Sequence, residues 1–147
     1  MSQTIRDNLQ RMLAPQHVAF VGGRSMARAL KRCAEGGYQG QMWLVNPQHD
    51  SLEGVPCVRS IADLPCGPDA VFIATNRDLT LTCVAELAVI GAGGAICYAS
   101  GFAETGAEGQ ALQQQLLATA GDMALLGPNC YGLLDYLHSA ALWPVAH

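Results

Sequence analysis

The sequence has few charged residues and no concentrated block of one sign. Charged side chains make up 14% of the 147 residues, and 8 lysines and arginines stand against 12 aspartates and glutamates, a formal net charge of −4. No basic run of the kind that binds a nucleic-acid backbone is present, so nucleic acid is not expected as a partner. Half of the residues are hydrophobic, which is typical of a globular chain with a buried core.

Long apolar runs and metal-binding patterns are missing as well. No apolar stretch approaches the roughly 18–20 residues of a membrane-spanning helix, so no membrane partner is expected. The six cysteines form no CxxC pair and the four histidines show no ligand spacing, so no metal site is expected. Several cysteines lie inside apolar runs, where a thiol packs as a small hydrophobe. Reduced cysteines and an N-terminus unlike a signal peptide together favour a cytoplasmic location.

Five short apolar runs recur along the chain, and each gap between them leaves room for one helix. Continuous apolar runs are typical of strands that are covered on both faces of a parallel sheet. The runs are Val18–Val21, Met42–Val45, Ala70–Ala74, Ala95–Ala99 and Met123–Leu126. The sequence therefore predicts a single α/β domain over residues 1–147. Its expected fold is Rossmann-like and doubly wound, a mostly parallel sheet of five to six strands with helices on both faces.

Capping residues and apolar spacing predict the helices between these runs. Ser25 is expected to cap a helix over residues 25–35. Thr105 and Glu108 fit a T-x-x-E capping box that begins another helix, which Gly121 ends. Residues 46–69 carry four prolines and are expected to form a loop-rich crossing with one helical turn near Ser60–Leu64. Further helices are expected over residues 5–13 and 78–90.

Ligands of an open parallel sheet bind beyond the carboxyl ends of its strands, so the residues after each run are the candidate binding residues. Gly22-Gly23-Arg24-Ser25 follows the first run, where glycine and a helix N-terminus favour a phosphate; a tight turn that binds nothing is the alternative. Asn46-Pro47 follows the second run, where NAD sites usually carry an acid, although the pair could simply initiate a turn. The missing acid and the missing third glycine of G-x-G-x-x-G count against NAD.

The later strand ends carry polar residues and turns. In Thr75-Asn76-Arg77-Asp78, Asn76 or Asp78 is expected to cap the next helix, and Arg77 either pairs with a phosphate or stands solvated at the rim. Ser100-Gly101-Phe102 follows the fourth run, with Phe102 expected to plug the core. Residues 127–132 (GPNCYG) form a tightly specified turn after the fifth run. Cys130 in this turn is expected to be structural, since no histidine lies near it in the sequence.

Taken in order, these segments resemble the CoA-binding domain of NDP-forming acyl-CoA synthetases, which include ADP-forming acetate–CoA ligases and the alpha subunit of succinyl-CoA synthetase. The matching pieces are VAFVGG (18–23), GGYQGQMWLVNP (36–47), GVPCVRSIADLP (54–65), PDAVFIAT (68–75), YASGFAETGAEG (98–109) and LLGPNCYG (125–132). The resemblance implies coenzyme A lying across the carboxyl ends of the strands. The expected CoA-binding residues, from the resemblance and the strand-end positions together, are Gly22, Gly23, Arg24, Ser25, Asn46, Pro47, Ala74, Thr75, Asn76, Arg77, Tyr98, Ser100, Gly101, Asn129 and Cys130.

The resemblance also implies a role for the chain. It would be the N-terminal, CoA-binding piece of a longer ligase that makes a thioester from a carboxylic acid, coenzyme A and a nucleoside triphosphate, and it would not be catalytic alone. The implied partners are a phosphohistidine domain and an ATP-grasp domain, in the same or a separate chain, with a homo-oligomer left open. The loop at residues 22–25 is shorter than the family's first phosphate loop. Two alternatives therefore stand: a degenerate, non-catalytic interaction or regulatory module, and an NAD-binding dehydrogenase-type domain.

Overall fold

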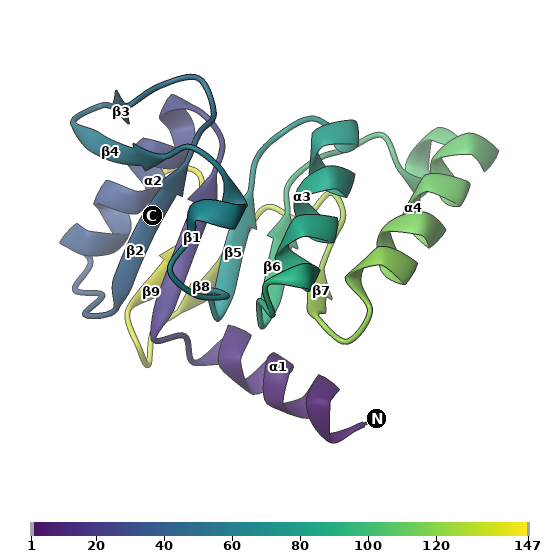
Figure 1. Ribbon diagram of the computed structural model, residues 1–147, viewed down its shortest axis with the longest axis horizontal. Coiled ribbons are helices and arrows are strands. Elements are labelled where there is room, and N and C mark those ends of the chain that lie inside the picture. Colours follow the sequence, from purple (N-terminus) through teal and green to yellow (C-terminus); the bar gives the residue numbers. More distant parts are fainter. Residues whose placement is uncertain (1, 147) are drawn as a thin grey trace.

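A seven-stranded sheet forms the centre of the structure, a computed structural model that describes residues 2–146 (Figure 1). The strand order is β3-β4-β2-β1-β5-β6-β7, and within the described residues only the β3–β4 pair of this sheet is antiparallel. The strands are β1 His17–Val21, β2 Gln41–Val45, β3 Ser51–Leu52, β4 Val55–Val58, β5 Ala70–Ile73, β6 Gly94–Cys97 and β7 Ala124–Leu126. The predicted Rossmann-like, mostly parallel fold is confirmed, and the chain order of the strands reverses at β1.

Two of the seven strands lie in the segment that the sequence predicts as a loop-rich crossing. β3 and β4 form a hairpin, and β4 continues the sheet by pairing parallel with β2, Leu44 opposite Cys57 and Val45 opposite Val58. Pro56 lies inside β4, and a proline within a short run argues against a strand. The sheet therefore has one or two strands more than predicted. The expected helical turn is confirmed as the 3₁₀ helix η1, Ile61–Asp63.

Both faces of the sheet are covered, as predicted. One apolar cluster joins the sheet to α1 (Gln3–Leu13), α2 (Arg24–Glu35) and a hairpin of β8 (Leu133–Asp135) and β9 (Ala140–Leu142). A second cluster joins the opposite face to η1, α3 (Arg77–Val89) and α4 (Ala107–Ala120), which follows the short helix η2 (Ala103–Thr105). Every residue of β5 and β6 is buried, which explains the continuous apolar runs of the sequence.

Two of the predicted helix N-caps are wrong and one is confirmed, while α1 begins two residues and α3 one residue earlier than predicted. α2 begins at Arg24 with Gly23 as its N-cap, so Ser25 lies within the first turn. α4 begins at Ala107, and the Thr105 hydroxyl donates to the carbonyl of Phe102 (2.8 Å) instead of forming a capping box with Glu108. Asn76 does cap α3, because its side-chain oxygen accepts the N–H of Leu79 (2.9 Å).

α1 is attached to the amino edge of the sheet through Asp69. The Arg11 Nε donates to one carboxylate oxygen (2.8 Å) and the N–H of Gln16 donates to the other (2.9 Å). The Arg11 guanidinium also donates to the carbonyls of Gly67 and Gly91. These contacts lie at the opposite end of the strands from the predicted ligand edge. None of the helices formed within residues 2–146 has the length and apolar character to cross a membrane.

Candidate functional site

Two hollows lie along the carboxyl edge of the sheet, and Thr75 lines both of them. The β1–β2 hollow has a volume of about 470 Å³ and lies where β1 and β2 end, against η1 and α3. The β6–β7 hollow has a volume of about 580 Å³ and lies beyond the ends of β5, β6 and β7. Because Thr75 lines both, the two hollows lie next to each other along the same edge of the sheet.

The turn from β1 into α2 brings the backbone close to the first hollow. Gly22 has φ +152°, and a Cβ there would stand 2.8 Å from the carbonyl oxygen of Ala74, so only glycine fits. A Cβ on Gly23 would instead meet nothing within 4 Å. Gly23 gives α2 no side-chain cap, which leaves the first N–H groups of the helix available to an anion.

Asn46 connects the loops that follow β1 and β2. Its Nδ2 donates to the carbonyl of Gly22 (3.0 Å), and its Oδ1 accepts the N–H groups of Gln48 (2.9 Å) and His49 (3.1 Å). Asn46 therefore initiates a turn, which was the alternative to ligand binding that the sequence left open. Its hydrogen bond to Gly22 also holds the turn between β1 and α2 in place. Asn46 and Pro47 both line the β1–β2 hollow.

Polar side chains and two tyrosines line the β6–β7 hollow. Asn129 and Cys130 stand above the end of β6, because their N–H groups donate to the carbonyls of Ala99 (2.8 Å) and Cys97 (3.0 Å). The rings of Tyr98 and Tyr131 lie 5.8 Å apart and both are exposed. The hollow thus offers amide and hydroxyl groups beside open aromatic surface.

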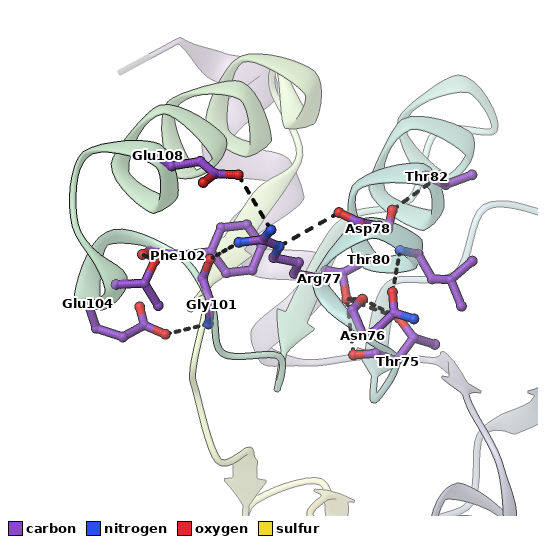
Figure 2. A network of polar contacts seen from close by, with 12 residues as sticks. Thr75, Asn76, Arg77, Asp78, Thr80, Thr82, Gly101, Phe102, Glu104 and Glu108 are labelled. Atoms are coloured by element: carbon purple, nitrogen blue, oxygen red, sulfur yellow. Dashed lines mark hydrogen bonds and ion pairs between the residues drawn. The ribbon is translucent and has the colours of Figure 1, made fainter.

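Arg77 holds the loop between β6 and α4, as Figure 2 shows. Its Nη1 donates to the carbonyl of Gly101 (3.1 Å), and the guanidinium stands 3.7 Å from the carboxylate of Glu108 and 3.8 Å from that of Asp78. The N–H of Gly101 donates to Glu104 (2.6 Å), and this backbone hydrogen bond lowers the pKa of the Glu104 carboxyl. Arg77 therefore lines the β6–β7 hollow while its charge faces protein groups.

Phe102 and several cysteines take structural positions. Phe102 is fully buried, which confirms its predicted role as a core plug. Burial raises the pKa of the Cys97 thiol to about 12 and that of Cys83 to about 11, so both stay protonated near neutral pH. Cys130 donates weakly to the carbonyl of Gly132 (3.7 Å). In the part of the chain that the structure describes, no three His, Cys, Asp or Glu side chains gather as metal ligands.

The structure brings most of the sequence-predicted site residues together at this edge. The β1–β2 hollow contains Gly22, Gly23, Asn46, Pro47, Ala74 and Thr75. The β6–β7 hollow contains Thr75, Asn76, Arg77, Tyr98, Ser100, Asn129 and Cys130. Three predicted residues, Arg24, Ser25 and Gly101, line neither hollow, and only Arg24 and Gly101 directly adjoin a residue that does.

Sequence reasoning missed several lining residues. Arg59 and Ser60 follow β4, and the rule that searches the carboxyl end of each strand would have found them had β4 been predicted. Glu86 and Cys83 reach the β1–β2 hollow from α3, which a strand-end search does not include. Tyr131 lies inside the predicted GPNCYG turn and also lines the β6–β7 hollow, although it is not among the predicted binding residues.

Comparison with known proteins identifies a family for the chain. Residues 16–135 match the family described as "CoA binding domain". The chain is 33% identical to a trans-feruloyl-CoA synthase from an unknown prokaryotic organism, over 91% of the chain and 20% of that protein. It is 30% identical to the ADP-forming acetate–CoA ligase II of Archaeoglobus fulgidus, over 97% of the chain and 23% of the ligase. The chain thus spans about a fifth of the length of these relatives.

A solved structure shows the same fold. The apo form of the dinucleotide-forming acetyl-coenzyme A synthetase 1 of Ca. Korarchaeum cryptofilum superposes with a TM-score of 0.82 at 26% identity, covering 92% of this chain and 31% of that one. A Pyrococcus horikoshii protein superposes with a TM-score of 0.85 at 22% identity, covering 94% of this chain and 33% of that one. At this identity the likeness supports the fold alone.

Proposed function

The chain belongs to the family of CoA-binding domains, with coenzyme A as its ligand, and on this premise we propose that it is the CoA-binding part of an ADP-forming acyl-CoA synthetase. Such an enzyme joins a carboxylic acid to coenzyme A with a nucleoside triphosphate as the energy source. This chain would contribute the holding and orientation of coenzyme A, which brings the thiol to the acyl group in reactive geometry. The family match favours coenzyme A over the NAD and non-binding alternatives.

The observation that carries the proposal is that two neighbouring hollows, both lined by Thr75, lie along the carboxyl edge of the sheet. Coenzyme A is elongated, with a nucleotide at one end, a pyrophosphate, and a pantetheine arm that ends in the thiol. We place the nucleotide in the β1–β2 hollow, where Val21, Val45 and Leu79 offer apolar walls to a base. The pyrophosphate then lies at Gly22-Gly23 and the α2 N-terminus.

The pantetheine arm would pass Thr75 into the β6–β7 hollow. Its amide groups need hydrogen-bonding partners, and Asn76, Ser100 and Asn129 line that hollow. The thiol would then end near Cys130 and Tyr131, at the open side of the sheet edge. The chain spans only about a fifth of the length of its relatives. We propose that the whole enzyme also contains the phosphohistidine and ATP-grasp domains that deliver the acyl group, and that this chain is the N-terminal piece of that enzyme.

Titration calorimetry of the chain with coenzyme A tests the proposal. Binding is expected, and coenzyme A at 100 times its Kd should raise the free energy of unfolding by about 2.7 kcal/mol, seen as a higher Tm. Gly23→Glu should weaken binding about tenfold or more, a loss of about 1.4 kcal/mol, because it sets a negative charge against the pyrophosphate. The fold should survive, since the added Cβ has no neighbour within 4 Å.

Gln114→Glu is the matched control, because it adds the same charge on an exposed position of α4 that lines neither hollow. Its affinity for coenzyme A should equal that of the parent chain. Absence of binding at millimolar coenzyme A contradicts the proposed function. Equal affinities in the Gly23→Glu and Gln114→Glu variants contradict the proposed placement of the pyrophosphate.

Alkylation by iodoacetamide tests the second hollow separately. Cys130 lines the β6–β7 hollow, whereas Cys66 is exposed just before β5, at the amino edge. Bound coenzyme A should slow the labelling of Cys130 and leave Cys66 unaffected, as measured by peptide mass spectrometry. Unchanged labelling of Cys130 under saturating coenzyme A would place the pantetheine arm elsewhere.

A further inference from the structure

Arg59 stands at the mouth of the β1–β2 hollow, beside the loop that follows β2. It comes directly after β4, whose last residue, Val58, accepts the N–H of Asn46 (2.9 Å). The Arg59 Nη1 donates to the carbonyl of Pro47 (2.7 Å), which holds the guanidinium against the Asn46-Pro47 turn. Arg59 itself lines the hollow.

The charge of this hollow is set by few groups. Among its lining residues in the described chain, only Arg59 and Glu86 carry charged side chains, so Arg59 is the one cation that an anionic ligand would meet there. The position after the second strand is where dinucleotide-binding folds contact the ribose. An acid there accepts the ribose hydroxyls, whereas an arginine nearby accommodates a phosphate on the ribose. Here the position holds neutral Asn46, with Arg59 next to it.

We propose that Arg59 binds the 3′-phosphate on the ribose of coenzyme A and thereby selects coenzyme A over ligands that lack this phosphate. The inference rests on the proposed function, because it presumes that the nucleotide occupies the β1–β2 hollow. Among the common adenine cofactors, NAD and ADP carry no ribose phosphate at this position, so the contact separates them from coenzyme A.

The guanidinium has capacity for this contact. It has five N–H donors, of which one goes to Pro47 and two to Oδ1 of Asp50 (3.1 and 2.6 Å), so two have no protein partner within residues 2–146. The Asp50 side chain is 91% exposed, and an ion pair so open to water is easily exchanged for a phosphate. A phosphate dianion also offers the bidentate geometry that arginine favours.

The affinities for coenzyme A and for 3′-dephospho-CoA, measured by calorimetry in the whole chain, test the assignment. The parent chain should bind coenzyme A about tenfold or more tightly than 3′-dephospho-CoA, a difference of about 1.4 kcal/mol. Arg59→Gln should lower the affinity for coenzyme A by that factor and leave the affinity for 3′-dephospho-CoA unchanged. Arg59→Lys should keep part of the preference for coenzyme A over 3′-dephospho-CoA, because lysine keeps the positive charge but cannot make the bidentate contact of a guanidinium.

Arg6→Gln is the control, since it removes the same charge from an exposed position of α1, and its preference should match that of the parent chain. Equal binding of the two ligands by the parent chain, or an undiminished preference in Arg59→Gln, overturns the assignment. Binding of neither ligand by the parent chain overturns the proposed function instead. If Arg59→Gln fails to fold, a competition experiment with the parent chain tests the assignment instead. Adenosine 3′,5′-bisphosphate should displace bound coenzyme A at lower concentration than 5′-AMP does. Equal displacement by the two nucleotides overturns the role of Arg59.

Discussion

At the scale of single residues, the contact between Glu104 and Gly101 makes the rim of the β6–β7 hollow sensitive to acid. The hydrogen bond from the Gly101 N–H holds the pKa of Glu104 below its ordinary value. A carboxyl whose pKa is lowered in the folded state stabilises that state above its unfolded pKa, and the contribution is lost as the pH falls through the folded pKa. The loop contact should therefore open only at acidic pH.

An NMR titration of the Gly101 amide checks this expectation. Its resonance should shift with an apparent pKa below that of an ordinary glutamate, and Glu104→Gln should abolish the shift. Glu108→Gln keeps the Gly101 contact and should leave the titration intact. A Gly101 shift that persists in Glu104→Gln would assign the titration to another group.

Residue roles could be predicted where the backbone position alone decides them. Asn76 caps α3 because it stands directly before the helix, and Gly22 is required where the chain passes Ala74. The predicted capping role of Thr105 is wrong because Thr105 ends the short helix η2, where its hydroxyl donates to the carbonyl of Phe102. No sequence pattern indicates η2. Arg77 faces Glu108, a partner set by the packing of α3 against α4, so no local pattern could reveal it.

At the scale of elements, α1 depends on a partly buried ion pair. The side chains of Arg11 and Asp69 are 33% and 10% exposed. Asp69→Asn should lower the free energy of unfolding by about 3 kcal/mol, because it leaves Arg11 without its carboxylate. Glu53→Gln, which breaks the more exposed pair with Arg28, should cost less than about 1 kcal/mol. Urea denaturation measures both, and equal losses would show that the Asp69 pair does not anchor α1.

Elements could be predicted where a strand lies in a continuous apolar run, as in β1, β2, β5, β6 and β7. β3 and β4 escaped because β3 has 2 residues and Pro56 interrupts the pattern of β4. β8 and β9 have 3 residues each, too few to show a period. Because β4 was not predicted, the residue after its carboxyl end, Arg59, was not among the predicted binding residues.

At the scale of the whole molecule, the β8–β9 hairpin completes the cover of one sheet face. Leu142 of β9 is fully buried in the same cluster as Phe72 and α2. Leu142→Ala should therefore cost about 2–5 kcal/mol of unfolding free energy by chemical denaturation. Leu137→Ala at the hairpin tip, where the side chain is 91% exposed, should stay within about 0.5 kcal/mol. A comparable loss at both positions would contradict the packing of the hairpin.

The architecture and the ligand edge could both be predicted, because the strand–helix rhythm places all carboxyl ends along one line. The closing hairpin could not, since its position depends on contacts between β9 and α2 that are far apart in the sequence. The division of the edge into two hollows that meet at Thr75 likewise depends on side-chain packing that no single segment specifies.

The two outermost strands of the sheet are also its shortest, β3 with 2 residues and β7 with 3. An outer strand carries unpaired N–H and C=O groups, and a long one can recruit a strand from another molecule and start aggregation. Strands this short offer an incoming chain only a few hydrogen bonds on either side. The edges of this sheet therefore offer little backbone for edge-to-edge pairing with a strand of another molecule.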